Sequence, residues 1–159
     1  MAYWRPIALA CAVLMFTVAE TASADAETRP TIERLVNEQA AAWSAGDADA
    51  VAASFTADAE FIVPGHRWRG RKAIRGAAAG YFATGQVASV EIERVLVDGS
   101  WGVVLWRWSE HDAEGANESL ADDAIVLRLD GDKIAYWREF IDRETPAKQK
   151  PVAAPADEP

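Results

Sequence analysis

The hydrophobic pattern changes period once along this chain, at Gly85, and that change sets the fold class. Upstream of Gly85, apolar residues recur every three or four positions, in segments that Gly46 and Gly70 separate. Downstream, four segments alternate apolar and polar residues, as strands with one buried face do. This order predicts three helices followed by an antiparallel meander, which is an α+β domain.

Capping and turn residues place the boundaries of these elements. Thr31 is a plausible N-cap for the first helix, Gly46 its stop, and Asp47 the N-cap of a second, short helix. Asp-Gly pairs between alternating segments are typical of tight hairpins. The expected elements are helices at residues 32–43, 47–55 and 71–83, strands at 59–63, 87–97, 101–111, 120–129 and 133–141, and hairpin turns at Asp98-Gly99, 112–117 and Asp130-Gly131.

The first 24 residues have the pattern of a secretory signal peptide. Arg5 precedes an apolar run at 7–18, and Ala22-Ser23-Ala24 is a small-x-small cleavage signal. The run is shorter than the roughly 20 residues that cross a bilayer. We therefore expect cleavage near Ala24 and a secreted or periplasmic protein that does not contact the membrane afterwards. The remaining chain predicts one domain at 25–145 and a disordered, Pro/Ala-rich tail at 146–159.

Charge and strand composition limit the partners. A net charge of −9 argues against nucleic acid or an anionic membrane as a partner. The predicted strands are apolar on both faces, because Trp101 and Leu105 point one way while Trp106 and Trp108 point the other. One face of the sheet packs against the helices, and the other apolar face must be buried by a second structure. We therefore expect a homodimer.

Four short motifs, in this order, resemble those of SnoaL-like domains in the nuclear transport factor 2-like superfamily, over about residues 32–142. This resemblance implies a cone, in which a curved antiparallel sheet wraps around three N-terminal helices and a pocket opens at the mouth. The superfamily includes isomerases, hydrolases, cyclases, dehydratases and non-catalytic binders, so the fold alone does not define the chemistry. The motifs are Trp43-Ser44-Ala45-Gly46-Asp47, Phe55-Thr56-Ala57-Asp58-Ala59, Gly70-Arg71-Lys72-Ala73-Ile74, and Gly131-Asp132-Lys133-Ile134 with Trp137-Arg138-Glu139-Phe140.

Ketosteroid isomerases of this superfamily use a carboxylate base with an oxyanion hole made by a tyrosine and a protonated aspartic acid. By the shared motifs, the tyrosine position corresponds to Gln39, the base to Val63 and the second acid to Ile125. None of these side chains can act as that base or as those donors. The mechanism loses both its proton acceptor and the stabilisation of its intermediate, so steroid isomerisation is excluded.

Limonene epoxide hydrolases offer a closer local resemblance, in the last strand. Their Lys-Ile-x-x-Trp-Arg-acid pattern resembles residues 133–139, which implies that Glu139 takes the role of the base. Their water-orienting tyrosine and asparagine correspond to Phe61 and Val63, which cannot hold a water. Their Arg-x-Asp pair has no complete counterpart, since the nearest segments are 107–109 and 108–110. Epoxide hydrolysis is therefore a minor alternative.

Strand alternation collects the acids into one candidate site. If Trp137 faces inward, Glu139 and Ile141 do so too, and the same parity on neighbouring strands adds Trp106, Trp108, Glu110, Asp123, Ile125 and Leu127. The opposite parity would admit Arg138 and Asp142, and a single bulge exchanges the two. The resemblance favours Glu139. The candidate catalytic residues are Glu139, Glu110 and Asp123, and the candidate ligand-binding residues are Phe55, Phe61, Val63, His66, Trp106, Trp108, Ile125, Trp137 and Ile141.

These acids have two interpretations. Enclosed by tryptophans, a carboxyl group has its pKa raised by desolvation, and a second acid nearby acts in the same direction, so a pair can serve as acid and base in turn. Alternatively, Glu110 and Glu139 are solvated charges paired with Arg107 or Arg138. His66, after the Pro64-Gly65 turn, is either a proton shuttle or a surface histidine.

The sequence contains no metal or cofactor motif. The chain has two histidines, no cysteine after residue 24 and no HExxH spacing, so we expect no metal site. Phosphate loops, nucleophile elbows and dinucleotide fingerprints are also missing, so we expect no cofactor. Two classes of function remain. One is a cofactor-free enzyme performing isomerisation, cyclisation, dehydration or hydrolysis on a small hydrophobic molecule, with Glu139 as the base and Glu110 or Asp123 assisting. The other is a non-catalytic ligand-binding or assembly domain.

Overall fold

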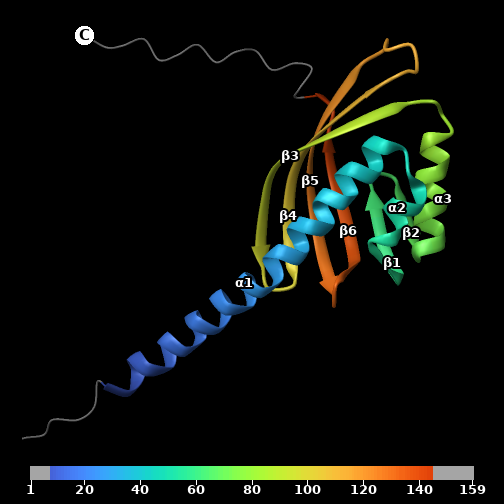
Figure 1. Ribbon diagram of the computed structural model, residues 1–159. Coiled ribbons are helices and arrows are strands. Elements are labelled where there is room, and N and C mark those ends of the chain that lie inside the picture. The colour runs from blue at the N-terminus through green and yellow to red at the C-terminus, as the bar shows by residue number, and fades with distance from the viewer. Residues whose placement is uncertain (1–7, 145–159) are drawn as a thin grey trace, which may run out of the picture.

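The computed structural model describes the backbone of residues 8–144 (Figure 1) and the side chains from residue 25 onward. It contains three helices and one sheet of six strands, so the α+β cone expected from the sequence is confirmed. The predicted tail at 146–159 and the first seven residues of the predicted signal peptide lie outside the described residues. The elements are α1 (Ala8–Ala45), α2 (Ala48–Ala53), β1 (Phe55–Val63), β2 (His66–Arg69), α3 (Arg71–Phe82), β3 (Val87–Asp98), β4 (Trp101–His111), β5 (Ser119–Asp130) and β6 (Lys133–Asp142).

The first helix begins well before its predicted start. Thr31 is not its N-cap, because α1 runs without a break from Ala8 and includes Pro30. Alanine and glutamate are common just upstream and favour helix, and this tendency outweighs the one hydrogen bond that Pro30 removes. The predicted end is confirmed, since the helix stops at Ala45 and Gly46 follows with φ +68°.

The second helix and the first strand also differ from the prediction. Asp47 caps α2 by accepting hydrogen bonds from the backbone N–H groups of Asp49 and Ala50. The helix nevertheless ends at Ala53, so Phe55 belongs to β1 rather than to α2. Phe55 is fully buried, and its β-propensity and burial override a weak continuation of the helix. Thus β1 begins earlier than residue 59.

Strand β2 was not predicted. It covers four residues and pairs antiparallel with β1 at the edge of the sheet, where Phe61 lies opposite Trp68. Three of its four side chains are basic or histidine, a composition typical of short edge strands but weak as a strand signal. His66 therefore lies in a strand rather than in a loop.

The sheet has the order β2-β1-β6-β5-β4-β3. The predicted meander from β3 to β6 is confirmed as consecutive antiparallel pairs. The sheet is not antiparallel throughout, because β1 lies parallel to β6. Such a pair needs a crossover, and α3, with the three strands that follow it, supplies the connection. In Figure 1, α1 crosses one face of the sheet while α3 lies beside β1 and β2.

One bulge decides which side chains of β6 face the helices. Ile134 pairs with Leu129 and Tyr136 with Arg128, so Ala135 is the extra residue. Ile134 and Trp137 are both fully buried, although alternation without a bulge would place them on opposite faces. Beyond the bulge, regular pairing puts Trp137, Glu139 and Ile141 on the inner face, opposite Leu127, Ile125 and Asp123 of β5. The parity favoured from the sequence is the one that the structure adopts.

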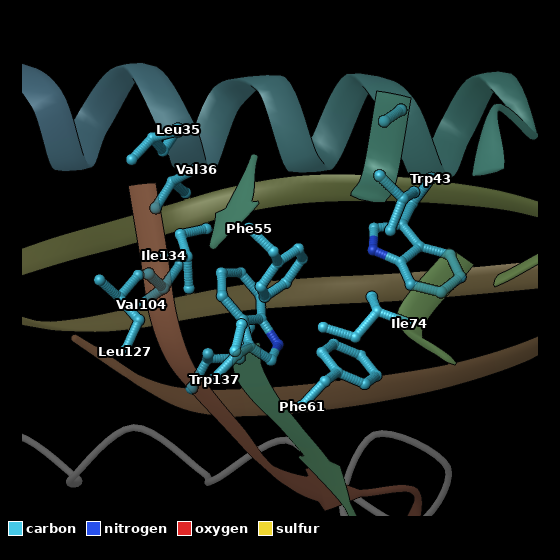
Figure 2. Packing of buried hydrophobic residues seen from close by; sticks show 14 of the residues in the cluster. Leu35, Val36, Trp43, Phe55, Phe61, Ile74, Val104, Leu127, Ile134 and Trp137 are labelled. Atoms are coloured by element: carbon cyan, nitrogen blue, oxygen red, sulfur yellow. The ribbon is translucent and has the colours of Figure 1, made fainter. Parts of the chain in front are cut away.

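The core lies between α1 and the inner face of the sheet (Figure 2). Apolar residues of α1 at helical spacing, among them Leu35, Val36 and Trp43, pack against the rings of Phe55 and Trp137 and the branched side chains of β4, β5 and β6. Gly102 lets the helix approach closely, since a Cβ atom there would lie 3.2 Å from the Ile32 side chain. Gln39, also buried, donates a hydrogen bond to the carbonyl oxygen of Val51 and so connects α1 to α2.

Gly70 is expected to be the least replaceable glycine of the fold. It precedes α3 with φ +86° and ψ 147°, a region that only glycine adopts without strain, and a Cβ atom would lie 3.1 Å from the carbonyl oxygen of Ala57. We expect Gly70→Ala to lower the free energy of unfolding by about 1–3 kcal/mol, measured by urea denaturation.

The matched control is Gly76→Ala, in the exposed interior of α3, where no atom lies within 4 Å of the added Cβ. Alanine is the better helix former, so this variant should be more stable than the wild type by about 0.5–1 kcal/mol. Equal effects of the two substitutions would contradict the strain argument.

Candidate functional site

A pocket of about 170 Å³ opens between the inner face of the sheet and the helices. Its aromatic walls come from α1, β1, β2, α3 and β4, while β4, β5 and β6 contribute three carboxyl groups. The aromatic lining residues are Trp43, Phe61, Trp68, Tyr81 and Trp108. The carboxyl groups are those of Glu110, Asp123 and Glu139, the three candidates from the sequence, so the structure brings all of them to one site.

Each of these acids accepts a hydrogen bond from the indole N–H of a tryptophan. Trp137 donates to Glu139 at 2.7 Å and Trp108 to Glu110 at 3.1 Å, each within a Trp-x-Glu segment of one strand. Trp106 donates to Asp123 at 2.9 Å from the neighbouring strand, where the two residues are directly paired. The tryptophans thus fix the carboxyl groups while surrounding them with apolar surface, which makes ionisation costly.

Glu139 has the most strongly altered acidity of the site. Burial raises its pKa to about 8, the nearby charge of Asp123 acts in the same direction, and the hydrogen bond from Trp137 opposes both. The residue is only part-buried as a whole, and it also borders an open groove between the ends of β1 and β6. At neutral pH its carboxyl group therefore holds a proton and lies within reach of the pocket.

Asp123 is the most enclosed acid, with 6% of its surface exposed. Burial raises its pKa, partly offset by the hydrogen bond from Trp106 and the charge of Arg143. One carboxyl oxygen, Oδ2, accepts the bond from Trp106, whereas Oδ1 is buried without any hydrogen-bond partner. Because Asp123 pairs with Ile141, it is the diagonal neighbour of Glu139 on the same face.

Glu110 differs from the other two acids. Burial raises its pKa, but hydrogen bonds from Trp108, Tyr81, Arg143 and Ser119 together outweigh burial, and the net pKa is lowered. The Tyr81 hydroxyl donates at 2.9 Å and the Arg143 guanidinium at 3.1 Å. Glu110 is therefore an ionised group that holds α3, β4, β5 and the end of β6 together around the pocket.

The alternative in which these glutamates pair with Arg107 or Arg138 is wrong. Arg107 binds Glu93 and Asp122 at exposed positions. Arg138 lies over the ring of Phe140, at 4.8 Å from its centroid. Both arginines have the strand parity opposite to that of Trp137, which separates them from the pocket.

The predicted ligand-binding residues fall into three groups. Phe61, Val63, Trp108 and Ile141 line the pocket as expected. His66 does not; it is exposed, stacks on Trp68 and borders the open groove. The third group lies beneath the pocket surface, because its side chains pack in the core. At most 1% of the surface of each is exposed: Phe55, Trp106, Ile125 and Trp137.

Several lining residues escaped the sequence analysis. Trp43 and Tyr81 lie on helices and Trp68 on the unpredicted strand β2. The count of seven tryptophans was a signal that more of them would surround the pocket. Arg143 gave no signal, because its contact with Glu110 joins residues far apart in the sequence. Ala77 and Ala121 complete the lining.

Among residues 25–144, whose side chains the structure describes, the acidic and histidine side chains do not form a cluster suited to a metal ion. Asp122 and Asp123 point to opposite faces, since Asp122 binds Arg107 and Asp123 binds Trp106. Within the same residues, none of the helices has the length and apolar content needed to span a membrane.

Comparison with known families identifies this arrangement as a SnoaL-like domain, whose family model matches residues 36–137. The chain belongs to that family. The match covers α1 from Val36 onward, the other two helices and the sheet as far as Trp137 of β6, and so includes most of the pocket. No curated protein matches the sequence.

Solved structures agree on the fold. A hypothetical protein from Catenulispora acidiphila with a ketosteroid isomerase-like fold, in complex with trimethylamine, is 23% identical, with a TM-score of 0.62 over 67% of this chain and 83% of that one. An LEH-like epoxide hydrolase from M. tuberculosis is 22% identical, with a TM-score of 0.61 over 77% and 85%. A putative SnoaL-like polyketide cyclase from Jannaschia is 17% identical, with a TM-score of 0.61 over 71% and 86%. At these identities the similarity concerns the fold.

Proposed function

We propose that the pocket carries out cofactor-free acid/base chemistry on a small, mainly hydrophobic molecule, by isomerisation, cyclisation, dehydration or hydrolysis. The observation that carries this proposal is the pair of enclosed acids, Glu139 and Asp123, on one face of neighbouring strands, both with raised pKa. Unusual acidity in a concave, largely apolar site is typical of groups that transfer protons.

The two acids have complementary roles in this proposal. With a pKa of about 8, Glu139 holds a proton at neutral pH yet ionises readily, which suits a group that donates and then recovers a proton. Asp123 assists as the second acid: burial raises its pKa, which favours proton uptake, and its Oδ1 is enclosed without a hydrogen-bond partner. The base role expected of Glu139 requires its ionised form, which loss of this proton supplies.

Glu110 assists by position. Its oxygens are occupied by donors from Trp108, Tyr81, Ser119 and Arg143, and its pKa is lowered, so it is a poor proton donor. Its bond to Tyr81 holds α3 against the sheet. In this proposal Glu110 maintains the shape of the pocket, and the proton transfers belong to Glu139 and Asp123.

The test is conversion of a panel of small apolar epoxides, enones and alcohols, followed by mass spectrometry, with the wild type and Glu139→Gln. Glutamine keeps the size of the side chain and its acceptor for the Trp137 N–H but cannot release a proton. We expect turnover of an accepted compound to fall by at least about 100-fold, the usual contribution of a positioned acid or base, while its affinity is retained.

Glu118→Gln serves as the control, because Glu118 is an exposed acid outside the pocket. Unchanged turnover in Glu139→Gln would contradict the catalytic role. The alternative function, non-catalytic ligand binding, is supported if no compound is converted and affinity for a bound compound is lost in Trp108→Ala but not in Glu139→Gln.

We also propose that the protein is exported and forms a homodimer. Support for cleavage near Ala24 comes from Asp25, whose carboxylate accepts a hydrogen bond from the backbone N–H of Gly99. Contacts with the domain therefore already exist at the first residue after the cleavage signal.

Support for a dimer comes from Leu96 and Phe140, two large apolar side chains that are about half exposed. Mass spectrometry of the mature chain and light scattering test these two proposals.

A further inference from the structure

The aromatic wall of the pocket, formed by Trp43, Phe61, Trp68, Tyr81 and Trp108, is continuous. Trp43, Tyr81 and Trp108 meet edge to face in all three combinations, with centroids 5.5–5.9 Å apart. Phe61 continues the wall by stacking on Trp43, and Trp68 lies 5.7 Å from Phe61. Aromatic ring faces carry partial negative charge, so an enclosure of several rings attracts cations.

The opposite side of the pocket carries an unsatisfied acceptor. Asp123 is more than nine-tenths buried and lines the pocket, and its Oδ1 has no hydrogen-bond partner. Leaving a buried polar oxygen unpaired costs about 1–3 kcal/mol, unless something else occupies the site. Because Oδ1 is itself enclosed, a positive charge in the pocket would act on the Asp123 carboxyl group through the electrostatic field and not by direct contact with Oδ1.

The charges that line the pocket do not balance. Arg143 is the one cation among the described lining residues, and it is bound to Glu110 at 3.1 Å. Arg143 forms its ion pair with Glu110 and its charge also acts on Asp123, but Asp123 and Glu139 have no ion pair of their own in the described part of the chain. The indole donors of Trp106, Trp108 and Trp137 are already used by the three carboxyl groups, whereas the Trp43 indole N–H is buried without a hydrogen-bond partner.

We propose that the ligand of this pocket is a small organic cation, a substituted ammonium ion, held between the aromatic wall and the carboxyl groups of Asp123 and Glu139. This inference rests on the proposed function, since it takes the same pocket as the reaction site and names the class of molecule that enters it. The cationic centre faces the carboxyl groups, and the alkyl groups contact the rings.

The size of the pocket agrees with such a ligand. A cavity of about 150 Å³ holds a benzene molecule, so 170 Å³ accommodates a nitrogen with a few small alkyl groups. A neutral hydrocarbon of the same size would fill the space but would gain nothing from either carboxyl group. An anion would be repelled by either carboxyl group in its ionised form.

Binding of a cation is linked to protons. A positive charge beside Glu139 favours its ionised form, so the ligand releases the proton that this group holds at neutral pH, and affinity rises with pH through about 8. Other titratable or charged groups on the neighbouring elements also affect the electrostatic potential at Glu139. In the pocket these are Asp123, Glu110, Tyr81 and Arg143. In the adjoining groove they are His66, Arg67, Arg138 and Asp142.

The experiment compares choline with 3,3-dimethylbutan-1-ol, in which a carbon replaces the charged nitrogen. Choline cannot lose its charge, so any pH dependence belongs to the protein. Calorimetry on the purified protein at constant ionic strength should give choline an affinity at least about tenfold higher than that of the alcohol at pH 9. At pH 6.5 this preference should shrink several-fold, and choline binding should release a proton.

Two variants locate the interaction. Asp123→Asn keeps an acceptor for Trp106 but removes the charge, and should weaken choline binding about tenfold while leaving the alcohol within twofold. Trp68→Leu, at a part-exposed position, should weaken choline several-fold even if Asp123→Asn fails to fold. Thermal melting checks folding.

The two proposals fail in distinguishable ways. If the alcohol binds as tightly as choline at both pH values, or if neither binds, the cationic ligand is ruled out. The acid/base function would then still be decided by turnover in Glu139→Gln. If choline is preferred and Glu139→Gln leaves turnover unchanged, the cation site stands and the catalytic assignment falls.

Discussion

Replacing Glu139 with glutamine should make the stability of this protein much less dependent on pH. Burial raises the pKa of Glu139 from its ordinary 4.5 to about 8 in the folded state. Between these values the unfolded chain has released this proton while the folded protein keeps it. The group therefore lowers the free energy of unfolding as pH rises across that window, by at most 1.4 kcal/mol per pH unit, and has no further effect above it.

Because Glu139 is only part-buried, the full shift overstates its effect on stability. We expect the difference in unfolding free energy, Glu139→Gln minus wild type, to grow by roughly 2–4 kcal/mol between pH 4.5 and pH 9. Acids that do not interact with Glu139 contribute equally to both proteins and cancel in this difference, whereas Asp123 is coupled to Glu139 and is part of the measured effect. Urea denaturation followed by tryptophan fluorescence at several pH values measures it.

The control is again Glu118→Gln, the same substitution at an exposed position outside the pocket. Glu110→Gln supplies a second comparison of opposite sign. The pKa of Glu110 is lowered, so its stabilising contribution is present above pH 4.5 and is lost as the pH falls below that value. A constant difference for Glu139→Gln across the whole range would show that this carboxyl group ionises normally.

The second large effect is expected at Trp137. Its ring is fully buried and contacts Phe55, Phe61 and Trp106, with centroids 5.4–6.5 Å away (Figure 2). Trp137→Ala removes this apolar surface and leaves a cavity between β6, β1 and β4, which should lower the free energy of unfolding by about 3–5 kcal/mol. Chemical denaturation at pH 7 measures the loss.

Trp137→Phe separates packing from hydrogen bonding. Phenylalanine fills much of the same space, so stability should fall less, but it cannot donate to Glu139. Since that bond lowers the pKa of Glu139, its removal should move the pKa above 8. The packing control is Trp101→Ala, because Trp101 is 45% exposed and should cost less than about 1 kcal/mol. Similar losses for Trp101→Ala and Trp137→Ala would contradict the assignment of Trp137 to the core.

The errors of the sequence analysis have local causes. Three of the four residues in β2 are His66, Arg67 and Arg69, so the strand has no apolar alternation to detect and exists because β1 offers it a free edge. The start of α1 was misplaced because a capping residue and a proline outweighed helix-forming residues upstream of Thr31. Both errors concern segments where propensity is weak or conflicting.

The sequence analysis predicted the acidic residues of the site better than its aromatic lining. Alternation within each strand defined two possible sets of inward residues, and the family resemblance selected the set that contains Glu139, Asp123 and Glu110. Alternation could not distinguish a lining side chain from one beneath the pocket surface, as with Phe61 and Phe55, which belong to the same strand. That distinction depends on which helix residues cover each position.

From the sequence alone, the three helices, the antiparallel meander and the α+β class follow, because each reflects a period set by local backbone geometry. Only the tertiary structure decides which acid holds a proton. Tyr81 and Arg143 reach Glu110 from distant segments and add to the local Trp108 bond that lowers its pKa, whereas burial raises the pKa of Glu139 and Asp123 and opposes their charge. Desolvation and long-range hydrogen bonds arise from packing, which residue spacing does not encode.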